Sequence, residues 1–233
     1  MSDKAKPSSR PRVQRGDRGD ATREKLLSAS VDVFGRYGFD GATTRKLADA
    51  AGVNLQAIPY YFGGKEGLYI ATAEYIGAAI SSHVGGLRER ARARLAERGG
   101  KIAPDEARAL LAEIVETMAA LFVSRESESW ARFLIREQME PTEAFVRVYG
   151  GVMKPMLDVV GKLIAIPIGE DPESQHVRLR TLALLGGVMV FRMANAAARA
   201  QLGWKTVGPR EVEAVQGLAR ELVAAIGPKG GNR

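Results

Sequence analysis

The sequence predicts an all-α protein in which a small N-terminal unit is followed by a larger helical unit. From Asp20 onward the apolar residues recur at the three- and four-residue spacing of an α-helix. Almost no segment alternates with the period of two that a β-strand requires. The 233 residues are 45% hydrophobic and 26% charged, which is enough apolar material for an ordinary globular core.

Composition narrows the class of protein further. The chain has no cysteine, which excludes disulfides and thiolate metal sites, and its net charge of +7 favours a polyanionic partner such as nucleic acid. A merely soluble basic surface fits that charge equally well. The N-terminal segment is polar and no run reaches the roughly 20 apolar residues of a membrane span. We therefore expect a cytoplasmic protein with no membrane partner.

The chain divides into four segments. Residues 1–19 are rich in Lys, Arg, Pro, Ser and Gly and predict a flexible basic arm, which either follows DNA or serves as a solubilising tail. Residues 20–67 predict a compact N-terminal domain, residues 68–227 a larger helical domain, and residues 228–233 a flexible tail. No Pro/Ser linker separates the two domains, so we expect one rigid helix to join them.

Three short helices are expected in the N-terminal domain. The first stops near Tyr37-Gly38, and the second begins after Thr43, a good N-cap residue, and is broken by Gly52. A third is predicted over residues 54–61, and Gly63-Gly64 ends it.

A long fourth helix begins at Lys65, and later helices are marked by their starts. One begins at Pro104, one spans residues 130–139, one spans 145–166, one follows Asp171-Pro172-Glu173 to about Arg199, and one begins at Gly208-Pro209. Gly150-Gly151 and Pro155 are expected to kink the helix over 145–166.

Residues 43–65 have the pattern of a helix-turn-helix. Small residues such as Ala48 and Ala51 allow two helices to cross closely, and Gly52 permits the positive φ of the tight turn. Asn54 is placed to cap the second helix, which then projects into a major groove. Gln56 can hydrogen-bond base edges, whereas its neighbours Leu55 and Ala57 can meet thymine methyl groups. At the start of the fourth helix, Lys65 suits a phosphate.

This segment resembles the TetR/AcrR family of transcription regulators over about residues 22–69. The resemblance is carried by Thr43-Thr44, Leu47-Ala48, Ala51-Gly52-Val53 and Tyr61-Phe62-Gly63-Gly64-Lys65-Glu66-Gly67-Leu68. It implies base-facing roles for Arg45, Gln56, Ala57 and Tyr60 and phosphate-facing roles for Thr44, Tyr61 and Lys65. The candidate DNA-binding set is therefore Thr43, Thr44, Arg45, Asn54, Leu55, Gln56, Ala57, Tyr60, Tyr61 and Lys65. Pro59 departs from the family, in which many members carry a DNA-contacting tyrosine, and it is expected to bend the third helix.

Two further sets are expected in the C-terminal domain. Residues 133–145 are similar to the effector domain of the CecR-like subgroup, which implies a ligand-sensing role. Apolar residues near the expected kink, with one cation, form the candidate effector site, although each fits a plain core role as well: Trp130, Phe133, Arg136, Met139, Tyr149 and Met153. The last two helices carry apolar stripes that either pack in the core or, as the resemblance implies, form a four-helix dimer interface: Leu182, Leu185, Gly186, Met189, Met193, Val215, Leu218 and Leu222.

The sequence therefore predicts a ligand-responsive transcriptional repressor that binds a palindromic operator as a homodimer and is released by a small apolar or amphipathic effector. Its recognition helices would lie about 34 Å apart, one turn of DNA. No cofactor, metal site or enzymatic activity is expected, because the two histidines lie far apart and no nucleophile motif is present. The alternatives are a sequence-independent architectural DNA-binding protein and an enzyme acting on an apolar substrate.

Overall fold

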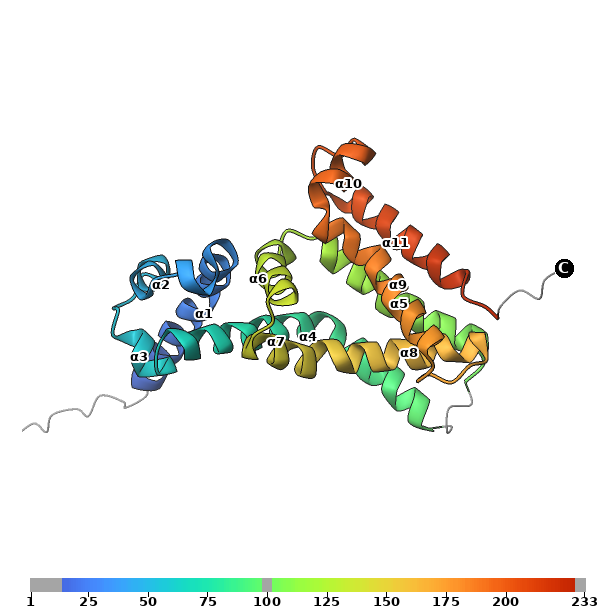
Figure 1. The fold of residues 1–233 in the computed structure, drawn as a ribbon, viewed down its shortest axis with the longest axis horizontal. Coiled ribbons are helices and arrows are strands. Elements are labelled where there is room, and N and C mark those ends of the chain that lie inside the picture. Colours follow the sequence, from blue (N-terminus) through green and yellow to red (C-terminus); the bar gives the residue numbers. More distant parts are fainter. Residues whose placement is uncertain (1–13, 98–101, 229–233) are drawn as a thin grey trace, which may run out of the picture. The chain divides into compact units, whose positions relative to one another are not determined.

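The computed structural model describes residues 14–97 and 102–228, and every regular element within them is helical (Figure 1). The chain forms two compact units that divide between Thr72 and Ala73. The division falls inside a helix, five residues after the expected boundary. Of the expected arm (1–19) and tail (228–233), residues 1–13 and 229–233 lie outside the described residues.

The first unit contains α1 (Gln14–Gly41), α2 (Thr44–Ala51), α3 (Ala57–Phe62) and the start of α4 (Lys65–Glu97). Helix α1 begins six residues before the predicted start at Asp20, within the predicted basic arm, because no proline lies between Pro11 and Asp20 and an established helix extends at little cost. Its geometry breaks at Gly38, where φ is 68°, at the predicted stop. Leu26, Phe34, Leu47, Ile58 and Leu68 are fully buried between these helices.

The second unit contains the rest of α4 and the later helices. These are α5 (Pro104–Val123), α6 (Ser127–Met139), α7 (Glu143–Val148), the π-helical segment η1 (Tyr149–Met153), α8 (Lys154–Ile168), α9 (Gln175–Met193), α10 (Asn195–Leu202) and α11 (Pro209–Ala224). Helices α5, α8, α9 and α11 pack together around a single apolar core. Among the described residues, no single helix is long and apolar enough to cross a membrane, and the bent pair α9–α10 passes that test only by its combined length and composition.

The distortion expected at Pro155 takes the form of a π turn. Lys154 N–H donates to the carbonyl of Tyr149, five residues earlier, so the chain carries one extra residue through η1. Pro155 then lies in the first turn of α8, so the π turn coincides with the position at which the helix lacks a backbone donor. The sequence thus predicted the position of the irregularity correctly. That the irregularity is a π turn is consistent with Gly150-Gly151, because glycine tolerates wide turns.

Two predicted boundaries near α9 are wrong. The N-cap is Ser174, whose hydroxyl accepts from Val177 N–H, because Asp171 instead closes the preceding turn by accepting from Glu173 N–H at 2.7 Å. The helix also ends at Met193 rather than near Arg199, and α10 follows at an angle of 83°. At the bend the Asn195 side chain donates to the Phe191 carbonyl, a local bond that competes with the helical ladder.

Candidate nucleic-acid interface

Helices α2 and α3 form the helix-turn-helix that the sequence predicts. Thr43 Oγ1 accepts from Lys46 N–H at 3.2 Å and starts α2. Gly52 ends it in the left-handed conformation, with φ of 63°, a region that residues with a Cβ atom rarely adopt. Val53 N–H then donates to the Ala48 carbonyl and closes the turn. These bonds fix the direction in which the chain enters α3.

The entry to α3 differs from the prediction by about three residues. Asn54 Oδ1 accepts from Gln56 N–H at 2.8 Å and its carbonyl accepts from Ala57 N–H at 2.9 Å, so Asn54 caps a turn that precedes the helix. Helix α3 therefore begins at Ala57, and Pro59 is its third residue. First-turn residues have no intrahelical acceptor for their N–H groups, so Pro59 neither breaks nor shortens the helix. Gly63 N–H donates to the Pro59 carbonyl at 3.1 Å, so the helical hydrogen bond that starts from Pro59 is made, and the expected bend stays a prediction.

The structure separates the ten candidate DNA-binding residues into two groups. Thr43 and Asn54 have capping duties, and Lys65 Nζ donates to the Phe39 carbonyl at 2.9 Å while lying 4.2 Å from the Phe39 ring centroid. Of the other seven, Arg45, Leu55, Gln56 and Tyr60 are exposed, whereas Thr44, Ala57 and Tyr61 are half-buried. On α3 and its entry turn, the exposed candidate residues that have no capping role are therefore Leu55, Gln56 and Tyr60.

Tyr60 is the most prominent side chain of this surface. It is 80% exposed, and its ring packs edge-on against Tyr61 with centroids 4.7 Å apart. Beside it, Pro59 is also exposed, and the sequence analysis did not assign Pro59 to the interface. Pro59 is exposed because α3 starts late. The turn in which Asn54 accepts from Gln56 N–H delays that start, and these two residues were the feature of the sequence from which the exposure of Pro59 could have been predicted.

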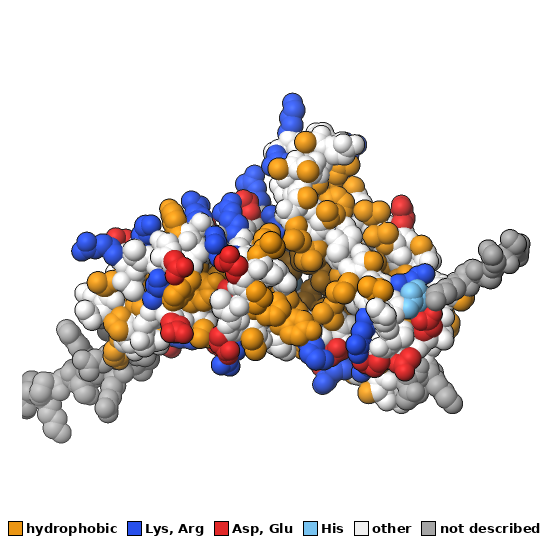
Figure 2. Space-filling model, in the orientation of Figure 1, with side chains coloured by type: hydrophobic (Ala, Val, Ile, Leu, Met, Phe, Trp, Pro, Cys, Tyr) orange, Lys and Arg blue, Asp and Glu red, His pale blue; other side chains and the backbone are white. Residues whose placement is uncertain are grey.

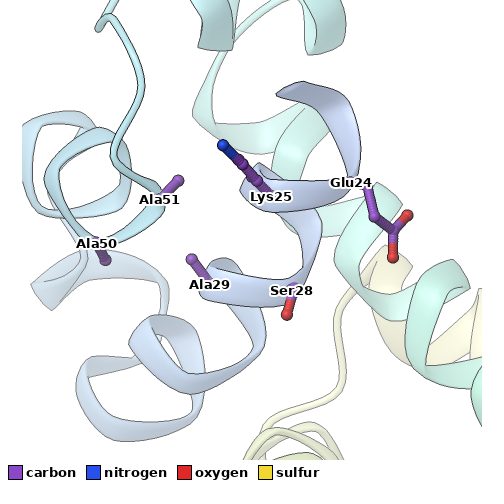
Figure 3. Close-up of a pocket in the computed structure, with 6 residues that line it drawn as sticks. All are labelled: Glu24, Lys25, Ser28, Ala29, Ala50 and Ala51. Carbon is purple, nitrogen blue, oxygen red and sulfur yellow. The ribbon is translucent and has the colours of Figure 1, made fainter. Parts of the chain in front are cut away.

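An open cleft lies between α1 and α2. Figure 3 shows Lys25 and Ala29 of α1 near Ala51 of α2, with Ala50, Ser28 and Glu24 completing the lining. Alanines line both sides of the cleft, which lets α2 approach α1 closely. The cleft therefore serves helix packing, and its side chains form no constellation for chemistry.

In the second unit, the candidate effector residues fall in different environments. Trp130 and Phe133 are buried on α6, and the Trp130 ring lies edge-on to His83 of α4 at 6.0 Å. Met139 is 78% exposed and Arg136 is exposed, so neither lines an enclosed site with them. Tyr149 stacks on Phe145 at 5.5 Å, and Met153 is half-buried, with Sδ accepting from Gln138 Nε2. Figure 2 shows hydrophobic side chains around a hollow in this unit, where Figure 1 draws α6, α8 and α9.

The candidate dimer residues also divide. Leu182, Met189 and Met193 are exposed on α9, Gly186 is half-buried, and Leu218 and Leu222 of α11 are half-buried. Leu185 and Val215 instead lie in the core of the unit, because they face the neighbouring helices of the same chain. The exposed members share one face of α9 with Leu179 and Val190, which the sequence analysis omitted.

Comparisons with known proteins match both units. Residues 26–72 match the family described as bacterial regulatory proteins, tetR family, and residues 107–228 match the C-terminal domain of the HTH-type transcriptional dual regulator CecR. CecR of Shigella flexneri is 33% identical over 201 residues, which cover 85% of this chain and 87% of that protein. The repressor NicS of Pseudomonas putida is 38% identical over 74 residues, 32% of this chain and 35% of that protein.

Solved structures share the fold. The hemolysin II regulator HlyIIR aligns with a TM-score of 0.60 at 15% identity, over 91% of this chain and 99% of that one. FadR of Bacillus subtilis, solved in complex with stearoyl-CoA, aligns with a TM-score of 0.57 at 20% identity, over 87% and 97% of the two chains. At these identities the likeness concerns the fold alone.

Proposed function

Because the chain belongs to the TetR family of bacterial transcriptional regulators and is CecR-like in its C-terminal unit, we propose that it is a repressor that binds a palindromic operator as a homodimer. A small apolar or amphipathic effector releases it. One observation carries the DNA-binding part: the Gly52 turn and the Asn54 cap hold α3 with Gln56 and Tyr60 exposed. Such a DNA-binding protein acts in the cytoplasm.

The exposed face of α9 supports the homodimer. Leu179, Leu182, Met189, Val190 and Met193 are each at least 38% exposed in the single chain. At about 100° per residue their positions fall within one sector of the helix, so they form one apolar stripe along it. A stripe of this length on a monomer is a liability in water and marks a contact surface. A second copy related by two-fold symmetry presents the same stripe, which makes the surface self-complementary.

The hollow of the second unit supports an apolar effector. Hydrophobic side chains surround it in Figure 2, and buried Trp130 and Phe133 belong to the helix beside it. A structural neighbour, FadR, holds stearoyl-CoA, a ligand with a long apolar part. An effector releases DNA only if it prefers the non-binding conformation, and switching from nearly full to nearly no occupancy requires a preference of about 10⁴-fold.

Selection of binding sites from fragmented genomic DNA tests the operator. We expect the wild-type protein at physiological salt to enrich a palindrome with half-sites about one helical turn apart. Arg45→Ala should lose or relax that enrichment, because exposed Arg45 lies in the first turn of α2. Arg36→Ala is the matched control, since it removes an exposed arginine of α1 that pairs with Asp32. Equal recovery of all fragments by the wild type would instead support a sequence-independent DNA-binding protein.

A further inference from the structure

The recognition surface of this protein is unusually poor in polar groups. Residues 54–62 contain no charged side chain. The exposed side chains are those of Asn54, Leu55 (41% exposed), Gln56, Pro59 and Tyr60. Asn54 Oδ1 already accepts from Gln56 N–H, so the side-chain amide of Gln56 is the one suited to pair with a base through both its oxygen and its nitrogen. Readers of guanine or cytosine usually use Arg, Lys, Glu or Asp at such positions. The composition of this surface therefore favours apolar contact with the bases.

These apolar groups are exposed because the fold of the first unit holds them outward. Ile58 is fully buried and anchors α3 against the core, which leaves its neighbours on the opposite side of the helix. Ala57, Pro59 and Tyr60 line a shallow hollow together with Gln56. The edge-on contact with Tyr61 braces the Tyr60 ring, and Pro59 has no side-chain rotamers to lose. Pro59 and the Tyr60 ring therefore lose little side-chain freedom when a partner binds.

The major groove offers one apolar group, the 5-methyl of thymine. Packing Leu55, Pro59 or Tyr60 against another base edge would leave that edge's donors or acceptors without water, at a cost in affinity. Arg45 of α2 is also exposed and is the charged candidate for a base or phosphate contact outside this surface. We propose that this recognition helix reads its half-site mainly through thymine methyl groups and that Pro59 is one of the contact residues. This proposal rests on the operator binding proposed above.

Replacement of thymine by deoxyuridine tests the proposal directly, because it removes the methyl group and preserves base pairing and phosphates. The probe is the duplex that the wild-type protein recovers from fragmented genomic DNA, with each half-site thymine replaced in turn and affinity measured by fluorescence anisotropy. We expect about fourfold weaker binding for each contacted methyl group, since burying one such group contributes on that scale. Thymines outside the half-sites should show no effect.

A protein variant then locates the contact. Pro59→Ala should reduce the thymine-to-deoxyuridine affinity ratio at one base pair of each half-site and leave the other positions unchanged. Pro104→Ala is the matched control, because Pro104 is also an exposed first-turn proline, at the start of α5. The deoxyuridine series with wild-type protein does not depend on how well either variant folds.

The outcomes separate this proposal from the one on which it rests. A specific palindrome whose affinity is unchanged by deoxyuridine, or whose half-sites contain no thymine, overturns methyl readout and leaves operator binding intact. If the thymine-to-deoxyuridine affinity ratio at every half-site position is the same for Pro59→Ala as for the wild type, Pro59 is not one of the contact residues. Failure to recover any preferred sequence overturns both proposals.

Discussion

Replacing Glu137 should destabilise the second unit, although this residue lies in no proposed binding site. Glu137 is 2% exposed, and its Oε2 accepts from Thr142 N–H (3.1 Å), Thr142 Oγ1 (2.8 Å) and Phe145 N–H (3.0 Å). The carboxylate on α6 therefore caps the N-terminus of α7, where a negative charge is also favourable. Glu137→Ala strands two backbone donors at about 1–3 kcal/mol each. Because Thr142 is exposed to water, we expect a loss of about 2–4 kcal/mol.

Urea unfolding followed by tryptophan fluorescence measures this loss. Trp130 and Trp204 are the two tryptophans of the chain, and both belong to the second unit. Glu137→Gln keeps one acceptor oxygen without the charge and should cost about 1 kcal/mol. Glu143→Ala is the matched control, since its exposed ion pair with Arg147 contributes at most about 0.5 kcal/mol. A Glu137→Ala free energy of unfolding within about 0.5 kcal/mol of wild type would refute the capping role.

Three further substitutions have defined outcomes. Gly52→Ala places a Cβ atom on a residue with φ of 63° and should destabilise α2 and α3 by about 1–3 kcal/mol, which faster amide hydrogen exchange in these helices would show. Gly86→Ala is the control, because Gly86 lies inside α4 with open space around it, and it should leave that exchange unchanged. Leu182→Glu places a charge on the α9 stripe, where Leu182 is 58% exposed, and should give monomers in sedimentation equilibrium while the unit stays folded; an unchanged dimer would contradict that interface. Arg192→Lys loses the fork of donors to the Phe122 and Ser124 carbonyls, and should lower the urea midpoint by an amount that corresponds to about 1–3 kcal/mol.

Much of the first unit could be predicted from local signals. Thr43, Gly52 and Gly63 each act through their own backbone geometry, so a cap or a left-handed glycine is visible without tertiary context. The start of α3 could not be predicted in the same way. Asn54 is equally suited to cap a helix and to cap a turn, and which of the two occurs depends on how Ile58 reaches the core.

The second unit was harder, because its sites depend on contacts between distant segments. The apolar stripes of α9 and α11 were evident, but periodicity does not distinguish Leu185, which packs inside its own unit, from Leu182, which faces outward. Met139 was grouped with Phe133 on the same helix, yet Met139 is exposed and Phe133 is buried. Buried Glu137 was passed over because a single carboxylate among charged neighbours carries no mark of burial.

The π turn at η1 sets the rotational phase of α7 relative to α8. Each residue of an α-helix advances the chain by about 100° around the axis, and the π turn takes up one residue more than a regular turn. Closing η1 into a regular α turn at unchanged chain length would therefore rotate everything before it by about that angle. The direction of exposed Val146 and Tyr149, on the N-terminal side of the turn or at its first position, depends on the π turn in this sense. Deleting Gly150 would restore the regular helical repeat and leave that apolar pair facing the same way. The hydrogen-bond pattern between Tyr149 and Lys154 is therefore as much a determinant of the surface of the second unit as the identity of its side chains.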